Sequence, residues 1–576
     1  MSVSDERSAL DRPVSLFDHA QRLHRRTPDD PLPDGGRPFP DDDAQPRTQV
    51  RAQRSLLREL LADPSLPAQE LHNRCLRLPI SIVATLIVGE VVSTPSEQLL
   101  ETARWLVRHG TDRRPVAIGI GLLIGRAEPR DVTLLKTIGR LRFVDRPAVL
   151  ALARIPGAGR DAIWLAERSR PHARLEAVEW LVGDQDPAVK AWVRATPRHL
   201  LSSDLARKIA ETHGLVDLST DDAQWDQVGN LLLAMTSPRN YQAQVGRYAD
   251  AAETYRRWVT VAERRTPSLD GAAMLAMVAE DLRTGFAAPV LGDDHERLID
   301  RIGGVLSAPP WLEFLHRSAE SDDPVEARRA AWAIAESAKG GVPTGRFAVR
   351  VVVPDPTPTS FSQIETRILI DGAPVIAQHF DKGAAEDPEY LVHGGRLRAL
   401  DHVKKVRLAE AYCTEGCCGA LYATITREGS EAVWQLEGHE FRFDAAEYDR
   451  EIARAERDHG WEWPARTAAR LIGERLRTEP QVLTQWDCRL NWCTAWLRDF
   501  DTVRLTFEHP AARASFDDPS VQFGLVIDVD GDPTTVAADV VESLRTVDPK
   551  STAEIVGGSK DGAEKLGLTD RASKRW

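Results

Sequence analysis

The chain has little of several side chains on which chemistry or membrane insertion often depends. It has only 6 cysteines in 576 residues, which excludes a disulfide-rich secreted domain. It also lacks long apolar runs, because the two most apolar stretches, Leu78–Val92 and Val116–Gly125, are shorter than the roughly 20 residues of a membrane-spanning helix. The sequence therefore predicts a protein that does not cross a membrane.

An excess of positive charge is also missing. The formal net charge is −13, which disfavours non-specific binding to nucleic acid or to an anionic membrane. The first residues, MSVSDERSALDRP, have neither the basic start nor the apolar core of a secretory signal peptide. No phosphate-binding loop, nucleophile elbow or kinase signature occurs in the sequence. We therefore expect a cytoplasmic interaction protein, and an enzyme is the less favoured interpretation.

The length and the local composition predict several domains. A chain of 576 residues exceeds the roughly 250–300 residues of a single core, and its 42% apolar and 28% charged residues are typical of globular proteins. The stretch around 27–47 is rich in proline and charged residues, which predicts disorder. A short helix is predicted before it, because one helical face would contain Leu16, Phe17, Ala20 and Leu23. We predict four regions: a largely disordered segment 1–50, a helical domain 51–340, an α+β domain 345–530, and a tail 531–576 that is helical and then flexible.

Helix starts marked by proline recur between residues 51 and 340. Proline is tolerated in the first helical turn because its missing N–H would have no partner there, and such starts are expected at Pro64, Pro115, Pro147, Pro171, Pro187 and Pro324. Two stretches look alike, 170–178 followed by Asp186-Pro187, and 322–331, which contains Asp323-Pro324 and Arg328-Arg329.

These two stretches resemble the HEAT-type helical repeat. In that repeat an Asp-Pro turn precedes a helix whose arginine reaches back to the turn acid. The resemblance covers roughly the N-terminal half of the chain and implies an α-solenoid, in which each helix pair buries its apolar face against the next. A helical bundle without repeats is the alternative.

After residue 340 the pattern becomes that of strands. Phe347–Val353 is apolar and β-branched, and Ile368–Ile370 enters an Asp371-Gly372 hairpin turn with Val375–Ala377 returning. Further strands are expected at 421–427, 432–436, 486–497, 502–507 and 521–529, and helices at 445–458 and 464–477. Hairpin strands with inserted helices predict an α+β domain with a mostly antiparallel sheet.

Five of the six cysteines lie in this second region, and they form the candidate metal site. Cys413, Cys417, Cys488 and Cys493 are the ligands that we would assign to zinc, because zinc is commonly held by two short-spaced pairs that the fold brings together. The alternation from Trp486 to Trp492 puts Cys488 on the buried face and Cys493 on the other, so both could bind one ion only if a bulge intervened. Core packing is the favoured interpretation; zinc and a reactive thiol are the alternatives.

Three functions follow as hypotheses. The first is a cytoplasmic scaffold whose helical array binds a protein partner. The second is a zinc-binding or enzymatic module in the 345–530 region, for which no catalytic residue and no firm cofactor can be named. The third is nucleic-acid binding along arginine-rich stretches at 104–114 and 140–154, which the net acidity opposes. The segment Trp461-Glu462-Trp463-Pro464, between two expected helices, is expected to form an exposed surface.

Overall fold

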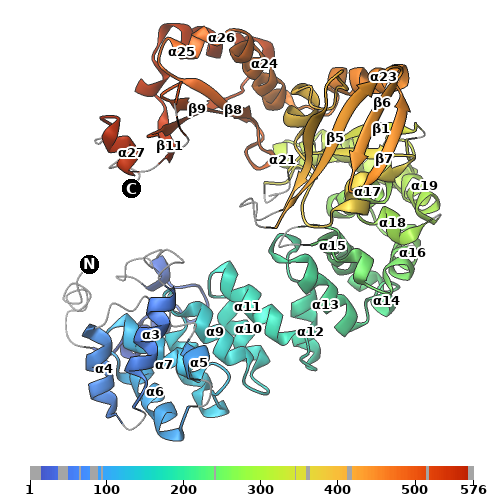
Figure 1. Cartoon of the computed structure of the whole chain (residues 1–576). Coiled ribbons are helices and arrows are strands. Elements are labelled where there is room, and N and C mark those ends of the chain that lie inside the picture. Colours follow the sequence, from blue (N-terminus) through green and yellow to red (C-terminus); the bar gives the residue numbers. More distant parts are fainter. Residues whose placement is uncertain are drawn as a thin grey trace. The chain divides into compact units, whose positions relative to one another are not determined.

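The computed structural model describes residues 14–36, 50–63, 66–77, 88–92, 95–238, 242–292, 294–343, 345–358, 363–411, 418–513, 515, 518–558 and 560–568. Helices occupy this chain from residue 16 to residue 337, and three antiparallel sheets with further helices follow (Figure 1). The predicted fold class, helices and then an α+β region, is confirmed. Two compact units result, one of residues 1–201 with 208–214 and one of residues 202–207 with 215–576.

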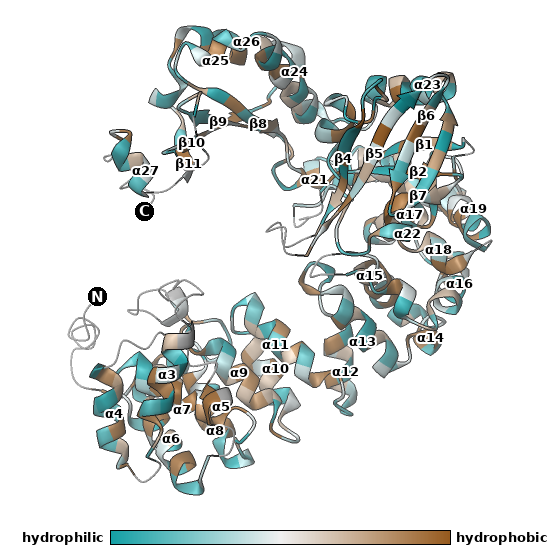
Figure 2. Cartoon of the chain, viewed as in Figure 1, coloured by the Kyte–Doolittle hydropathy of each residue, from teal (hydrophilic) through white to brown (hydrophobic). Residues whose placement is uncertain are grey.

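The first unit is helical in its described part. Its helices are α2 (Leu16–Arg26), α3 (Val50–Leu60), α4 (Ala68–Arg77), α5 (Val88–Val91), α6 (Glu97–His109), α7 (Arg113–Leu123), α8 (Val132–Ile138), α9 (Asp145–Ala153), α10 (Gly159–Ala166), α11 (Pro171–Leu181) and α12 (Pro187–Arg194). Nearly every side chain of α7 is buried, as its apolar sequence requires, and in Figure 2 this helix is mostly brown, whereas α6 beside it has both teal and brown residues. Among the described residues, no helix of either unit has the length and apolar character needed to cross a membrane.

Proline starts predict the helix boundaries well. Pro171, Pro187 and Pro324 each occupy the first helical position, while Pro64 lies outside the described residues. Asp186 and Asp323 cap α12 and α21 (Pro324–Ser337), and each accepts a backbone N–H at 2.8 Å. The arginine of the second repeat-like stretch, Arg329, pairs with Asp355 and Asp270. The HEAT-like array itself stays a prediction.

The second unit begins with helices around a stacked tryptophan pair. Its helices are α14 (Leu215–Leu218), α15 (Trp225–Met235), α16 (Ala251–Ala262), α17 (Leu269–Thr284), α18 (Ala288–Leu291), α19 (Asp294–Leu306), α20 (Pro309–Ala319) and α21, while α13 (Ser203–His213) belongs to both units. Trp225 and Trp258 are fully buried with ring centroids 4.5 Å apart and planes 6° apart. Each indole N–H donates to the backbone carbonyl of the other residue, at 3.0 and 2.9 Å, so neither buried donor is left without an acceptor.

Three antiparallel sheets make up the strand region. The first is β1 (Phe347–Val352), β2 (Glu365–Ile370) and β3 (Ala373–Pro374), and the second is β4 (Lys404–Glu410), β5 (Ala420–Glu428), β6 (Glu431–Leu436) and β7 (His439–Asp444). The third has the order β11-β10-β9-β8, from β8 (Arg489–Thr494), β9 (Thr502–His509), β10 (Val521–Asp528) and β11 (Glu554–Gly558). The remaining helices are α22 (Val375–His379), the π-helix η8 (Glu389–His393), α23 (Ala445–Arg457), α24 (Pro464–Thr478), α25 (Gln481–Thr484), α26 (Pro533–Thr546) and α27 (Lys560–Lys565).

Helices and sheets of the second unit are joined by buried polar contacts. Glu280 of α17 pairs with Arg350 of β1 at 3.1 Å, and the indole N–H of Trp332 in α21 donates to the Val353 carbonyl at 3.0 Å. Asp281 lies 3.7 Å from Arg367 and accepts the backbone N–H groups of Phe286 and Ala287, which follow α17. The change from helix to sheet near residue 340 therefore lies inside one compact unit.

Several local predictions can be compared with the structure. The short helix at Leu16, the Asp444 cap of α23 and the helix starting at Pro464 are confirmed. Residues 375–377 are not the returning strand that the sequence predicts: they form α22, and only Ala373 and Pro374 pair with β2. Of the stretch 27–47, predicted to be disordered, residues 27–36 are described and end in a 3-10 turn at Pro33–Gly36; the rest, like most of segment 1–50, lies outside the described residues.

Candidate functional site

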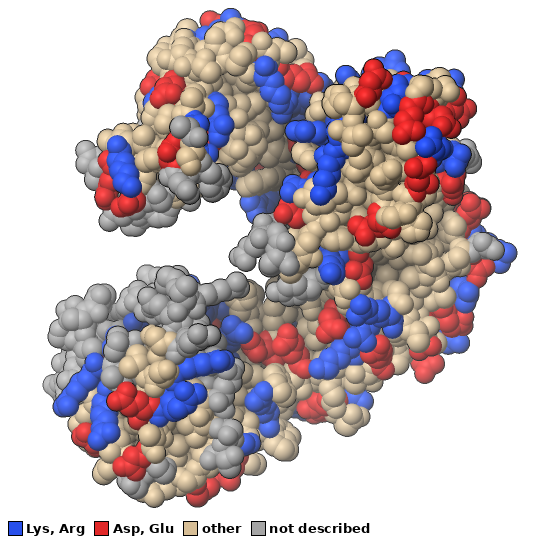
Figure 3. Space-filling view, in the orientation of Figure 1, with Lys and Arg blue, Asp and Glu red and all other residues tan. Residues whose placement is uncertain are grey.

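A pocket of about 890 Å³ lies in the second unit, among η8, α24, β8 and the residues that follow β8. Four arginines and two carboxyl groups line it, together with Tyr390, Trp492 and Trp496; the charged residues are Arg396, Arg466, Arg477, Arg498, Asp387 and Glu389. The chain as a whole is acidic, whereas this pocket has more basic than acidic side chains. Figure 3 shows basic and acidic groups interspersed over the visible surface.

The carboxyl pair and one buried arginine form the centre of the site. Arg466 is 3% exposed, and its Nη2 lies 3.0 Å from Asp387 Oδ2 and 2.6 Å from Glu389 Oε2. Its other amino group donates to the Ala495 carbonyl at 3.1 Å and to the Thr494 hydroxyl. One guanidinium group thus joins η8 to β8 and to the residue after it.

The local sequence explains how these groups are positioned. Pro388 precedes η8, and Asp387 accepts the backbone N–H of Glu389 at 2.8 Å, which fixes the start of the π-helical turn. Arg466 lies in the first turn of α24, after Pro464. A cation at a helix N-terminus is unfavourable because the positive end of the helix dipole lies there, so the two carboxyl groups compensate for both the dipole and the burial.

The two carboxyl groups differ in protonation. Burial raises the pKa of Glu389 well above its usual range, and the adjacent Asp387 raises it further. Burial also acts to raise the pKa of Asp387, but Arg466 and the hydrogen bond with Glu389 outweigh it, and the net pKa of Asp387 is lowered. Within the pair, Glu389 is therefore the carboxyl group that takes up a proton first as the pH falls. Among the described residues Glu389 Oε1 is buried without a hydrogen-bond partner, so it is available to a ligand.

Two of the pocket arginines have no acidic partner in the described part of the chain. Arg396 is exposed and makes no ion pair there; its guanidinium lies 5.3 Å from the centre of the Tyr390 ring. Arg477, in the last turn of α24, is also exposed and forms no ion pair with any described residue. Two further pocket residues, Trp492 and Trp496, stack on each other with ring centroids 5.8 Å apart. The pocket therefore offers unpaired positive charge next to aromatic surface.

The structure places the predicted cysteine ligands only in part. Cys413 and Cys417 lie outside the described residues. Cys488 and Cys493 are both buried in the core of the third sheet, as free thiols. Burial raises the pKa of Cys488 to about 11 and that of Cys493 to about 12, which disfavours a reactive thiolate at either position. Among the described residues neither belongs to a group of three metal-binding side chains.

A bulge in β8 accounts for the burial of Cys493. Leu490 pairs with Phe507 and Trp492 pairs with Thr506, so Asn491 is the extra residue. The bulge turns Cys493 back to the core, where it is 5% exposed, and leaves Trp492 half-buried at the pocket. The sequence predicts a strict alternation of buried and exposed side chains along this strand. That prediction is wrong after Leu490.

The segment Trp461-Glu462-Trp463-Pro464 is not the exposed surface that its composition predicts. Trp463 is 7% exposed and stacks on Phe500, and the side chain of Glu462 is 1% exposed. Trp461 lies under the guanidinium of Arg466, 5.6 Å from its ring centre. The link between α23 and α24 is therefore largely buried, and it packs against the pocket residue Arg466.

The sequence offers weak signals for this site. Asp387-Pro388-Glu389 is an acidic pair around a proline, and Arg466 lies two residues after the proline helix start at Pro464. Neither pattern indicates a site alone, because 76 residues lie between positions 389 and 466. Comparison with known proteins adds no assignment: no protein-family model, curated protein or solved structure matches this chain.

Proposed function

We propose that the second unit binds a small organic anion with an aromatic or apolar part in the pocket between η8, α24 and β8. The observation that carries this proposal is the pair of exposed arginines, Arg396 and Arg477, which line the pocket without an ion pair in the described structure. Arginine side chains that lie in a concave site without a protein partner are suited to carboxylate or phosphate groups, which they bind in bidentate fashion.

Charge and shape both favour such a ligand. The pocket has four guanidinium groups and only two carboxyl groups. The stacked indoles of Trp492 and Trp496 offer apolar surface beside these charges. A volume of about 890 Å³ lies within the usual range of small-molecule sites.

Glu389 gives the pocket a carboxyl oxygen, Oε1, that has no hydrogen-bond partner among the described residues. A carboxyl oxygen can accept a hydrogen bond from a ligand hydroxyl or amine. The Cys493 thiol stays protonated because burial raises its pKa to about 12, so it does not supply a nucleophile. These features support binding as the function of the pocket.

The proposal is tested with simple probes on the full chain. Phenyl phosphate, benzoate and citrate are titrated by calorimetry, with phenol as the uncharged control. We expect at least one anionic probe to bind, and Arg396→Gln and Arg477→Gln each to weaken it by about 10-fold, because each removes a charge-assisted hydrogen bond. Arg475→Gln is the matched control, since Arg475 is an exposed arginine of the same helix outside the pocket.

Two results would reject this function. One is that none of the anionic probes binds to the folded protein. The other is that Arg396→Gln, Arg477→Gln and Arg475→Gln have equal affinity for the probe that binds.

We also propose that the helical region serves as a protein-binding scaffold in the cytoplasm. Trp180 of α11 favours this idea: it is 47% exposed, and the Arg154 guanidinium lies 3.6 Å from its ring centre. Exposed tryptophan and arginine are frequent at the centres of protein interfaces. A pull-down that returns the same proteins with the wild-type chain and with Trp180→Ala would remove this support.

Nucleic acid is a weaker candidate, because Arg104 in the arginine-rich stretch is already paired with Asp131, Glu101 and Glu128.

A further inference from the structure

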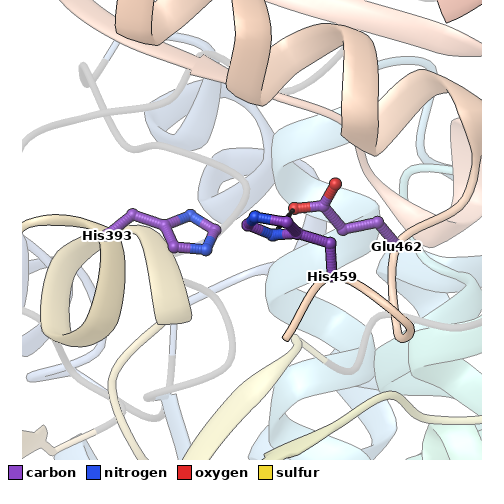
Figure 4. A group of neighbouring side chains, drawn as sticks. All are labelled: His393, His459 and Glu462. Atoms are coloured by element: carbon purple, nitrogen blue, oxygen red, sulfur yellow. Dashed lines mark ion pairs between the residues drawn. The ribbon is translucent and has the colours of Figure 1, made fainter. Parts of the chain in front are cut away.

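Two histidines and one glutamate of the second unit lie close together. His393 is the last residue of η8, and His459 and Glu462 lie in the link between α23 and α24. One potential ligand atom from each residue lies within 4.8 Å of the others. In Figure 4 the two imidazole rings face each other, with the Glu462 carboxylate beside His459.

The imidazole nitrogens lack hydrogen-bond partners. Both ring nitrogens of His393 are buried and have no hydrogen-bond partner among the described residues. His459 Nδ1 is buried as well, and it lies 3.3 Å from Glu462 Oε1 without hydrogen-bond geometry. Buried polar atoms are nearly always satisfied, because leaving one unpaired costs about 1–3 kcal/mol. A group that binds at this point would satisfy these nitrogens.

We propose that His393, His459 and Glu462 bind a divalent transition-metal ion of the zinc class. Two imidazoles and a carboxylate are ligands typical of zinc and of other late first-row ions. Ligands at about 2.1 Å from a tetrahedral ion lie about 3.4 Å apart, and the 3.3 Å between His459 Nδ1 and Glu462 Oε1 fits this value. The wider spacing to His393, up to 4.8 Å, requires a small rotation of its ring.

Neighbouring side chains contact two of the three ligands, Glu462 and His393. Thr467 donates its hydroxyl to Glu462 Oε2 at 3.0 Å, and Arg470 Nε donates to Oε1 at 2.8 Å. These bonds leave lone pairs of the carboxylate free, and outer contacts of this kind hold a ligand in position. The His393 ring stacks on Trp461, with centroids 6.1 Å apart.

The site has room for a further ligand and an acceptable charge. The three protein ligands leave at least one coordination position open, and the side chain of His459 is 37% exposed, which gives access to solvent. Arg470 opposes the binding of a cation, but Glu474 pairs with it at 3.2 Å. With both histidines neutral, the two glutamates and Arg470 together have one negative charge, which favours a cation.

The experiment uses the full chain after removal of metal with a chelator. Zn²⁺ is titrated by calorimetry, and Co²⁺ is followed by the visible absorption of four- or five-coordinate cobalt. His459→Ala is the first variant, because this side chain is partly exposed and its loss should not unfold the protein; thermal melting checks that. We expect at least about a 100-fold loss of affinity in His459→Ala and in Glu462→Gln, and about a 10-fold loss in Thr467→Val, which removes only an outer contact.

Two controls separate this site from other histidines and from the cysteines. His439 lies 5.6 Å from His379, ring centre to ring centre, and is not part of a three-ligand group among the described residues, so His439→Ala should bind metal as the wild type does. The double variant Cys413→Ser, Cys417→Ser should retain the site as well. Unchanged affinity in folded His459→Ala and Glu462→Gln overturns the proposal, and so does a loss of all binding in the cysteine double variant alone.

Discussion

Asp281 shows how a single buried side chain makes stability depend on pH. It is buried at the end of α17, and this burial, only partly opposed by Arg367, raises its pKa to about 6. The carboxyl group is therefore easier to protonate in the folded chain than in the unfolded chain, where its pKa is near 3.9. Below pH 4 the proton on Asp281 makes its full contribution to the free energy of unfolding. This contribution is lost as the pH rises from 4 through 6.

Asp281→Asn removes this titration, so the unfolding free energy of the wild type relative to the variant should fall by about 2 kcal/mol from pH 4 to pH 6.5. Urea unfolding at several pH values measures this difference. Asp270→Asn is the control, because Asp270 is an exposed aspartate near the start of the same helix. A difference that stays constant across this range would show that Asp281 does not titrate there.

Arg466 is the residue on which the centre of the pocket depends. Arg466→Met removes the buried cation and leaves Asp387 and Glu389 next to each other without the guanidinium group that pairs with both. We expect a loss of about 3 kcal/mol of stability at pH 7, in the range measured for broken buried ion pairs, and a smaller loss at pH 4, where Asp387 can take up a proton. Chemical denaturation at both pH values tests this, and an equal loss at both would contradict the assigned charges.

At the scale of elements, the bulge at Asn491 decides which face of β8 is buried. Deletion of Asn491 should remove the bulge and leave Cys493 on the core face, because Leu490, Trp492 and Cys493 then alternate opposite Phe507, Thr506 and Leu505. Labelling with a thiol reagent and mass spectrometry of the peptide report this. Cys493 should react slowly both in the deletion variant and in Asn491→Ala, which keeps the bulge. Ready labelling of Cys493 in the folded deletion variant would mean that Asn491 is not the extra residue.

Elements with local signals could be predicted, whereas contacts between distant segments could not. Asp186 and Asp444 are followed by helices because a capping carboxylate and its helix are neighbours in sequence. The extra residue in β8 has no local signal, because Asn491 fits a regular strand as a polar position. His459 and Glu462 are spaced as in one turn of a helix, but His393 is 66 residues away and reaches them only because η8 packs beside the link. The approach of these three residues is a tertiary property, and no periodicity encodes it.

At the scale of the whole molecule, the helices from α14 to α21 and the sheets belong to one compact unit. Contacts such as Glu280 with Arg350 and Trp332 with Val353 cross from helix to strand. A fragment of residues 215–576 should therefore unfold in one cooperative transition, whereas 345–576 should lose those partners and expose apolar surface. Calorimetry and dye binding compare the two fragments. A stable, cooperative 345–576 fragment would place the boundary of the folding unit near residue 340 instead.

The indoles of Trp225 and Trp258, parallel and in contact, are close enough for their electronic transitions to couple. Such coupling produces a paired positive and negative band in the far-ultraviolet circular dichroism spectrum. Because both chromophores belong to the second unit, that band reports its integrity without any label. The paired band should disappear in Trp258→Phe. In the wild-type chain, the temperature at which the band is lost on heating would report the unfolding of the helices around the tryptophan pair.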